Sequence, residues 1–191
     1  MKKIFKIITL FLFALNCNAQ AVVNINTFNQ GNNSNKYFKD IDNFYQNFTG
    51  TWENTSGSIT FRLIIWKETN AEMKSISNSH IDLLKTKYLI IENLGTDTQR
   101  VLYNSVRFFK ISGTTTQSVM NTWAVSGNGF RGIFTDTNAN NRTRVLTAIA
   151  DFSILNLGTA PLQAHWKLKG LALDEDDYCS VPTDAILTKV N

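Results

Sequence analysis

The sequence is poor in the residues that mark several protein classes. It has only 2 cysteines, 2 prolines and 2 histidines among 191 residues. So few cysteines exclude a disulfide-rich small domain, and so few prolines exclude a collagen-like or proline-rich chain. Charged residues make up 18% and hydrophobic residues 43%, which excludes a disordered polyelectrolyte. What remains is one globular domain with a sizeable core, for which 13 Phe, 5 Tyr and 4 Trp supply aromatic rings.

Residues 1–19 have the three parts of a secretory signal peptide. The basic start contains Lys2, Lys3 and Lys6. An apolar run over residues 7–15 follows, and the small residues Cys17 and Ala19 occupy the positions that a signal peptidase reads. We therefore predict cleavage after Ala19 and export to the periplasm or the extracellular space. The alternative is a lipoprotein acylated at Cys17, although Asn16 fits that processing site poorly.

Removal of this signal changes the charge and the cysteine chemistry of the chain. The sequence has 19 Lys and Arg against 15 Asp and Glu, and three of the lysines lie in the signal, so the mature net charge is about +1. That value argues against a nucleic-acid partner, which needs a clustered basic face. Only Cys179 would remain, which excludes an intramolecular disulfide. No later apolar run approaches the roughly 20 residues that span a bilayer, so we expect no transmembrane segment in the mature chain.

The mature chain divides into a polar lead-in and one domain. Residues 20–35 are rich in asparagine, and we expect a flexible lead-in with a short strand over Val22–Ile25. The domain covers residues 36–191. Its first element is predicted to be a short helix over Lys36–Phe48, because apolar residues recur there at spacings of three and four. The segment Thr69–Leu84 has no clear period and is predicted to be irregular, with a helical turn near its end.

After residue 50 the apolar period changes from helical to two, which predicts a succession of short strands. The nine expected strands cover residues 51–55, 58–67, 85–93, 99–111, 118–125, 130–135, 143–155, 162–169 and 185–190. One face of the second strand is predicted to point inward and consists of Ile59, Phe61, Leu63 and Ile65. Short turns without alternating helices exclude a parallel α/β sheet. The predicted fold is therefore mainly β, an antiparallel barrel of eight to nine strands with a short N-terminal helix.

Gly50-Thr51-Trp52 resembles the G-x-W start of the lipocalin and wider calycin barrels. This resemblance implies a helix that closes one end of a barrel and a basic residue of the last strand packed on the tryptophan ring. Lys189 occupies the matching place. A second resemblance is to a family of small secreted Bacteroidetes proteins of unknown function, and it covers residues 36–44, 48–53, 60–61 and 182–189. It implies export and a barrel-like fold, and it carries no activity, cofactor or catalytic residue.

We identify no catalytic or metal-binding motif in the sequence. It has no G-x-S-x-G elbow, P-loop or G-x-G-x-x-G. His80 and His165 are too few for a zinc site without carboxylate ligands. The acidic run Asp174–Asp177 lacks the spacing of an EF-hand, which favours a solvated loop over a calcium site. Cys179 is predicted to be a buried or half-buried thiol, and we expect no enzyme activity, no metal and no cofactor.

Three tryptophans on predicted strands, Trp52, Trp123 and Trp166, are the candidate ligand-binding residues. They could line an apolar cavity in the mouth of the barrel, or they could pack in the core as large aromatic side chains commonly do. Two functions therefore stay open. The first is an exported, non-enzymatic binder of a small apolar ligand in a lipocalin-like barrel. The second is a surface or matrix interaction protein whose barrel is filled by its own side chains. The sequence leaves the oligomeric state open.

Overall fold

The chain is mainly β, as predicted. The computed structural model describes residues 20–28, 30–76, 78–105, 118–136, 138, 146–170 and 179–190. Its strands are β1 (Ala21–Asn24), β2 (Lys36–Lys39), β3 (Gly50–Ser56), β4 (Ile59–Glu72), β5 (His80–Glu92), β6 (Arg100–Asn104), β7 (Met120–Ser126), β8 (Gly129–Asp136), β9 (Leu146–Ile154), β10 (Gln163–Lys169) and β11 (Asp184–Lys189). The described residues also include two 3₁₀ helices, η1 (Ile25–Thr27) and η2 (Phe44–Asn47).

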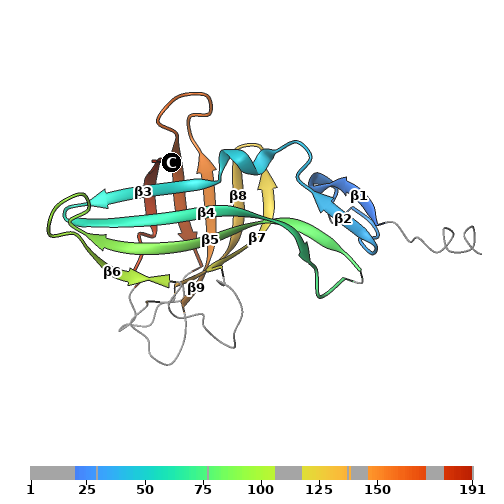
Figure 1. Cartoon of the computed structure of the whole chain (residues 1–191), viewed down its shortest axis with the longest axis horizontal. Helices are drawn as coiled ribbons and strands as arrows, with labels where there is room; N and C mark the ends of the chain where they lie inside the picture. Colours follow the sequence, from blue (N-terminus) through green and yellow to red (C-terminus); the bar gives the residue numbers. More distant parts are fainter. Residues whose placement is uncertain are drawn as a thin grey trace, which may run out of the picture.

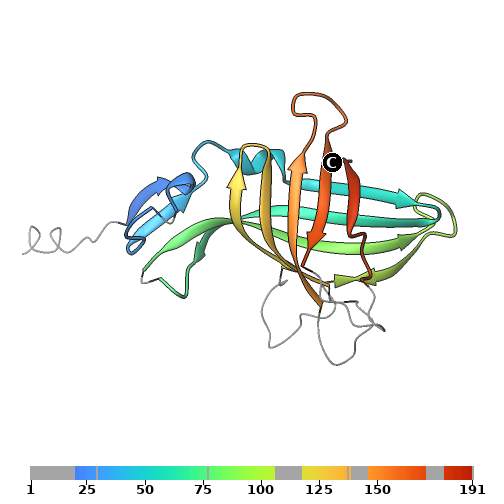
Figure 2. The same ribbon diagram turned by 180° about the vertical axis from the view of Figure 1, so that it is seen from behind.

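The strands form one mixed sheet. Its path has the order β1-β2-β5-β4-β3-β11-β10-β9-β8-β7, and β6 pairs with β5 beside this path. The β1–β2 and β2–β5 pairs are parallel, and the other pairs are antiparallel. Strands β3, β4 and β5 run side by side, and β7 to β11 cross behind them in Figure 1 and in front of them in Figure 2. The buried apolar side chains of both groups of strands form one core cluster.

The two groups of strands are joined in two different ways. At one side β11 pairs with both β10 and β3, which is a regular ladder. At the other side no ladder joins β7 to β5 within the described ranges. Instead, Val119 N–H donates to Thr86 O at 2.9 Å, Thr86 N–H donates to Ser118 Oγ at 2.7 Å, and Thr122 Oγ1 donates to Leu84 O at 3.4 Å. We call this contact the β5–β7 junction; side-chain hydroxyls take part in two of its three hydrogen bonds.

The predicted helix over Lys36–Phe48 is wrong. Residues Lys36–Lys39 form β2, which pairs with β1 and β5, and the only helical part is the single 3₁₀ turn η2. Asn43, just before η2, has a left-handed backbone with a φ of 56°, through which an α-helix cannot continue. The apolar residues that produced the helical spacing are nevertheless buried, and they include Phe38, Tyr45 and Phe48. Because the segments predicted as lead-in and helix contribute β1 and β2, the described part of the sheet has eleven strands rather than eight to nine.

The prediction of an irregular segment over Thr69–Leu84 is also wrong for most of its length. Strand β4 continues to Glu72, and β5 already begins at His80. The β4–β5 register shifts between Glu68 and Ala71, so the simple alternation of side chains is interrupted there. The long β4–β5 hairpin extends beyond the neighbouring strands toward β1 and β2 (Figure 1).

The predicted inward face of β4 is confirmed. Phe61, Leu63 and Ile65 are buried, and Ile59 packs against the core from the start of the strand. Arg62 lies on the other face, where it forms an ion pair with Glu53 of β3. The period of two in this segment therefore reports the face of the sheet correctly.

Candidate functional site

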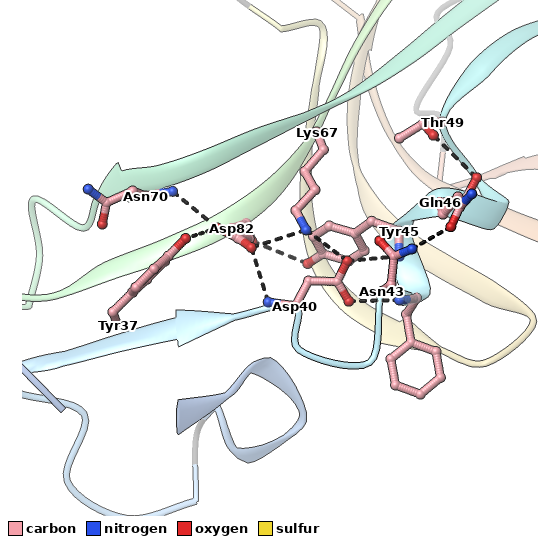
Figure 3. A network of polar contacts seen from close by, with 10 residues as sticks. Tyr37, Asp40, Asn43, Tyr45, Gln46, Thr49, Lys67, Asn70 and Asp82 are labelled. Carbon is pink, nitrogen blue, oxygen red and sulfur yellow. Dashed lines mark hydrogen bonds and ion pairs between the residues drawn. The ribbon is translucent and has the colours of Figure 1, made fainter. Parts of the chain in front are cut away.

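Two buried carboxylates share one lysine where β2 and η2 meet the β4–β5 hairpin (Figure 3). Asp40 follows β2 and Asp82 lies in β5, and their exposed fractions are 4% and 0%. Lys67 of β4 places Nζ 3.0 Å from Asp40 Oδ2 and 3.3 Å from Asp82 Oδ2. Tyr37 and Tyr45 lie beside these charges. We call these five residues the Asp82 cluster.

Asp82 is the acceptor on which several segments converge. Its Oδ1 accepts hydrogen bonds from Tyr37 OH at 2.5 Å and from Asn70 N–H at 3.1 Å. Its Oδ2 accepts from Asp40 N–H at 3.0 Å and contacts Lys67 Nζ. Burial by itself raises the pKa of an acid, but these donors outweigh it, so the pKa of Asp82 lies below its usual value. Asp82 is therefore a carboxylate at neutral pH.

Asp40 holds the turn that follows it. Its Oδ1 accepts from Phe44 N–H at 2.8 Å, and its Oδ2 accepts from Tyr45 N–H at 3.2 Å. These are the first N–H groups of η2, so Asp40 acts as a capping side chain. The same Oδ2 accepts from Lys67 of β4. Asp40 thus links η2 to the hairpin.

The Asp82 cluster links β2 and η2 to β4 and β5. Burial and the hydrogen bond to Asp82 raise the pKa of Tyr37 to about 12, and burial with both carboxylates raises the pKa of Tyr45. Burial lowers the pKa of Lys67, but the two carboxylates outweigh it and the net shift is upward. Both tyrosines therefore stay protonated near neutral pH. Each carboxylate oxygen already has a donor, so the cluster offers no free base.

The candidate tryptophans Trp52 and Trp166 both lie in the core. Each has an exposed fraction of 0%. Trp52 Nε1–H donates to Phe48 O at 2.8 Å, and Trp166 Nε1–H donates to Pro182 O, also at 2.8 Å. Trp123 belongs to β7, but its side chain lies outside the described residues. The structure therefore brings two of the three candidates into one packed cluster.

The predicted contact between Trp52 and Lys189 is confirmed. The two residues are partners in the β3–β11 ladder, and Lys189 Nζ lies 5.6 Å from the centroid of the indole ring. The ammonium group also donates to Asn47 O at 3.4 Å. Burial lowers the pKa of Lys189. This contact joins the first strand after η2 to the last strand of the chain.

The sequence reasoning overlooked Trp66. This tryptophan is half-buried on β4 and does not belong to the core cluster. Its partner across the ladder is Lys85, and Ile64 lies two residues earlier on the same face. With the described residues Trp66 forms no hydrogen bond or ring contact. The signal was available in the alternation, because a strand that turns Ile65 inward must turn residue 66 outward.

Both histidines have hydrogen-bond partners. His80 Nδ1 lies 2.8 Å from Gln20 Nε2, and His165 Nε2 lies 2.6 Å from Asp184 Oδ1. His165 is on the outer face of β10, and His80 begins β5 rather than lying in an irregular segment. Two further features of the sequence lie outside the described residues, namely Cys17 and Asp174–Asp177.

Cys179 is a half-buried free thiol. Burial, together with the nearby Asp136 carboxylate, raises the pKa of Cys179 to about 11, so the side chain stays protonated and unreactive at neutral pH. Asp136 is itself buried and accepts from Tyr88 OH at 2.7 Å and from Ser180 Oγ at 2.7 Å. The thiol therefore lies beside a second polar network, centred on Asp136 of β8, rather than in a nucleophilic site.

Within the described residues, no group of three or more His, Cys, Asp or Glu side chains could hold a metal ion, and no helix is long and apolar enough to cross a membrane. No curated protein and no solved structure matches the chain. One family model, described as a family of unknown function (DUF6705), matches residues 1–190. Since this match spans nearly the whole sequence, the chain belongs to the DUF6705 family.

Proposed function

We propose that the protein is an exported, non-enzymatic interaction protein. Its interior is filled by its own side chains, and the outer face of β3 to β5 binds a partner. The observation that carries this proposal is the packing of the tryptophans. The two buried ones have their rings and N–H groups engaged inside the chain, whereas Trp66 faces outward.

The interior supports this proposal because aromatic rings contact one another across it. Trp52 meets Phe152 edge-on at a centroid distance of 4.9 Å, and Phe152 stacks on Phe130 at 4.8 Å. Trp166 contacts Phe61 at 5.9 Å. Rings at these distances are in direct contact and leave no space for a ligand between them. The described part of the core therefore resembles a packed protein interior.

The outer face supports the proposal by its composition. Ile64 and Trp66 of β4 and Leu83 and Leu89 of β5 are half-buried there and stand apart from the core cluster. Lys87 lies across from Ile64 and has no ion-pair partner in the part of the chain that the structure describes. An aromatic and aliphatic centre with a charged rim is typical of protein interfaces. We call these five residues the Trp66 face.

Binding of the labelled protein to the surface of the cells that produce it tests this proposal. We expect Trp66→Ala to weaken binding by roughly tenfold or more, because a central tryptophan often contributes about 2 kcal/mol to an interface. Ile149→Ala is the matched control, since Ile149 is an exposed isoleucine on the outer face of β9. Equal binding of the wild type and Trp66→Ala would contradict the proposal.

A small apolar ligand in a lipocalin-like barrel is the second candidate function. It is favoured by the β5–β7 junction, where no ladder joins the strands within the described ranges. Thr86 lies at this junction, and its Oγ1 is buried with no hydrogen-bond partner among the residues that the structure describes. A ligand with one polar group could enter between β5 and β7 and bind that hydroxyl. Native mass spectrometry separates the candidates, because a filled interior predicts the mass of the chain alone and a ligand adds its own mass in a one-to-one ratio.

Export by cleavage after Ala19 is part of the same proposal. It is supported by the basic start, the apolar run and the small residues of the signal. N-terminal sequencing of the exported protein is expected to begin at Gln20. A fatty-acylated Cys17 at the new terminus would instead identify a membrane-anchored lipoprotein.

A further inference from the structure

The N-terminal segment, defined as residues 20–28 and 30–39, is attached to the sheet by a short ladder, by the buried side chain of Phe38 and by hydrogen bonds to Asn78 and Ser79. Among the described strands, β1 pairs only with β2. Strand β2 pairs with β5 through two residue pairs, Tyr37 with His80 and Phe38 with Ile81. Both strands lie at one end of the sheet path, beside the tip of the β4–β5 hairpin (Figure 2). Such a short ladder has few backbone hydrogen bonds, so other contacts must contribute to holding the segment.

The Asp82 cluster supplies polar contacts to this attachment. Asp82 of β5 accepts from Tyr37 OH and from Asp40 N–H, which lie in and directly after the N-terminal segment. An ionised carboxylate offers only acceptors, whereas a protonated carboxyl group carries a donor hydrogen on one oxygen. A protonated Asp82 therefore cannot accept from all the donors that surround it. Protonation also removes its attraction for the Lys67 ammonium group.

His80 forms a further contact between β5 and the N-terminal segment. Its Nδ1 faces Gln20 Nε2 at 2.8 Å, and an amide nitrogen is a donor. The charged and titratable groups around the attachment are Lys36, Tyr37, Lys39, Asp40, Asp42, Tyr45, Lys67, Glu72, His80 and Asp82. Lysine and tyrosine side chains keep their protons in acid, so the Asp82 carboxylate is the group through which acid acts on this attachment.

We propose that acid releases the N-terminal segment from β5 while the rest of the sheet stays folded. The segment is then a pH-sensitive strap that is docked at neutral pH and free in acid. Release uncovers the backbone edge of β5 at His80 and Ile81. The core strands do not depend on this attachment, because β3, β4 and β8 to β11 are paired on both sides without it.

Hydrogen exchange of the full chain at pH 7, pH 4 and pH 2, corrected for the intrinsic pH dependence of exchange, tests the proposal. Because the pKa of Asp82 lies below its usual value, we expect the protection of the amides of residues 36–40 to fall at least about tenfold only between pH 4 and pH 2. The amides of β9 and β10 are expected to keep their protection. Asp82→Asn is expected to show the acid pattern already at pH 7. Asp184→Asn is the matched control, because Asp184 is an exposed carboxylate far from β2 in the sheet path.

Tyr37→Phe keeps the test decisive if Asp82→Asn fails to fold. Loss of the Tyr37 hydroxyl removes one of the donors that hold Asp82 in its ionised form, so release is expected at a higher pH than in the wild type. Unchanged protection of residues 36–40 at pH 2 would overturn the proposal. Equal loss of protection in residues 36–40 and in β9 would also overturn it, because the whole protein would then unfold together.

Discussion

At the scale of single residues, two buried threonines differ in whether their hydroxyl groups have a hydrogen-bond partner. Thr60 and Thr86 are both buried, with exposed fractions of 1% and 0%. The Thr60 hydroxyl lies 2.9 Å from the Thr55 hydroxyl, and one of the two donates to the other. Thr86 Oγ1 has no partner within the described structure. A paired and an unpaired buried hydroxyl should therefore respond oppositely to the same substitution.

Thr86→Val is expected to stabilise the protein by about 1–3 kcal/mol, because it removes the desolvation penalty of an unpaired hydroxyl at nearly constant shape. Thr60→Val is the matched control and should destabilise, because it leaves Thr55 without its partner. Urea unfolding of both variants measures the two changes. Destabilisation by Thr86→Val would mean that a water or a ligand binds that hydroxyl, and it would favour the small-ligand function.

Phe61→Ala is expected to cost about 3–5 kcal/mol in the free energy of unfolding, because it leaves a cavity in a packed core. Phe61 is 3% exposed, and its ring lies 6.1 Å from that of Tyr88. Ile64→Ala on the opposite face of β4 should cost much less. Denaturant melts compare the two variants, and a cost below about 1 kcal/mol for Phe61→Ala would remove Phe61 from the core.

Among the strands, a row of alternating charges crosses the outer face of four neighbours. Arg131 of β8 lies opposite Asp151 of β9, which lies opposite Lys167 of β10, which lies opposite Asp184 of β11. Lys169 adds a second cation 2.5 Å from Asp151. Opposite charges across strands favour one register, and a slip by one residue would bury them. The row therefore specifies how these strands align.

Asp151→Asn is expected to remove a stability contribution that depends on pH. The hydrogen bond from Arg131 outweighs partial burial and, with Lys169, lowers the pKa of Asp151 to about 2. A lowered folded pKa contributes stability above the unfolded value near 3.9, and this contribution is lost as the pH falls toward the folded value. Urea melts at pH 6, 4 and 2 should show the difference between wild type and Asp151→Asn shrinking with acid. A difference that stays constant with pH would contradict the assignment, and Asp97→Asn, at an exposed carboxylate, serves as control.

For the molecule as a whole, β11 has the central topological role. It pairs with β10 and β3 and so joins the C-terminal strands to the first antiparallel hairpin. Its Leu187 is fully buried, while its Ile186 faces outward and is 44% exposed. At the opposite side the two groups of strands meet only through the β5–β7 junction within the described residues. Loss of β11 would leave the two groups without a ladder between them.

Deletion of residues 184–191 is therefore expected to abolish cooperative folding, as measured by circular dichroism and thermal unfolding. Deletion of residues 20–35 is the contrasting control. It removes β1, which lies at the end of the sheet path, and the remaining sheet should still unfold cooperatively. A folded protein without β11 would show that the β5–β7 junction and the core packing suffice to hold the two groups of strands.

The sequence by itself determined most strands and the buried face of β4. The alternation around Phe61 identified the inward side of β4, because side chains of a strand point to opposite faces in strict succession. The contact between Trp52 and Lys189 was also predictable, from the resemblance of the G-x-W start to the calycin barrels. The same alternation would have placed Trp66 outside, had it been applied one residue further.

Only the tertiary structure decided what happens at residues 36–48 and 69–82. There the apolar spacing was ambiguous, and the outcome depends on hydrogen bonds between residues that are distant in the chain. Tyr37 and Asp82 are 45 positions apart, yet their hydrogen bond helps to place β2 as a strand on β5. A carboxylate is buried only where several donors converge on it, and that convergence is a property of the folded chain. No local pattern in the sequence predicts this convergence of donors.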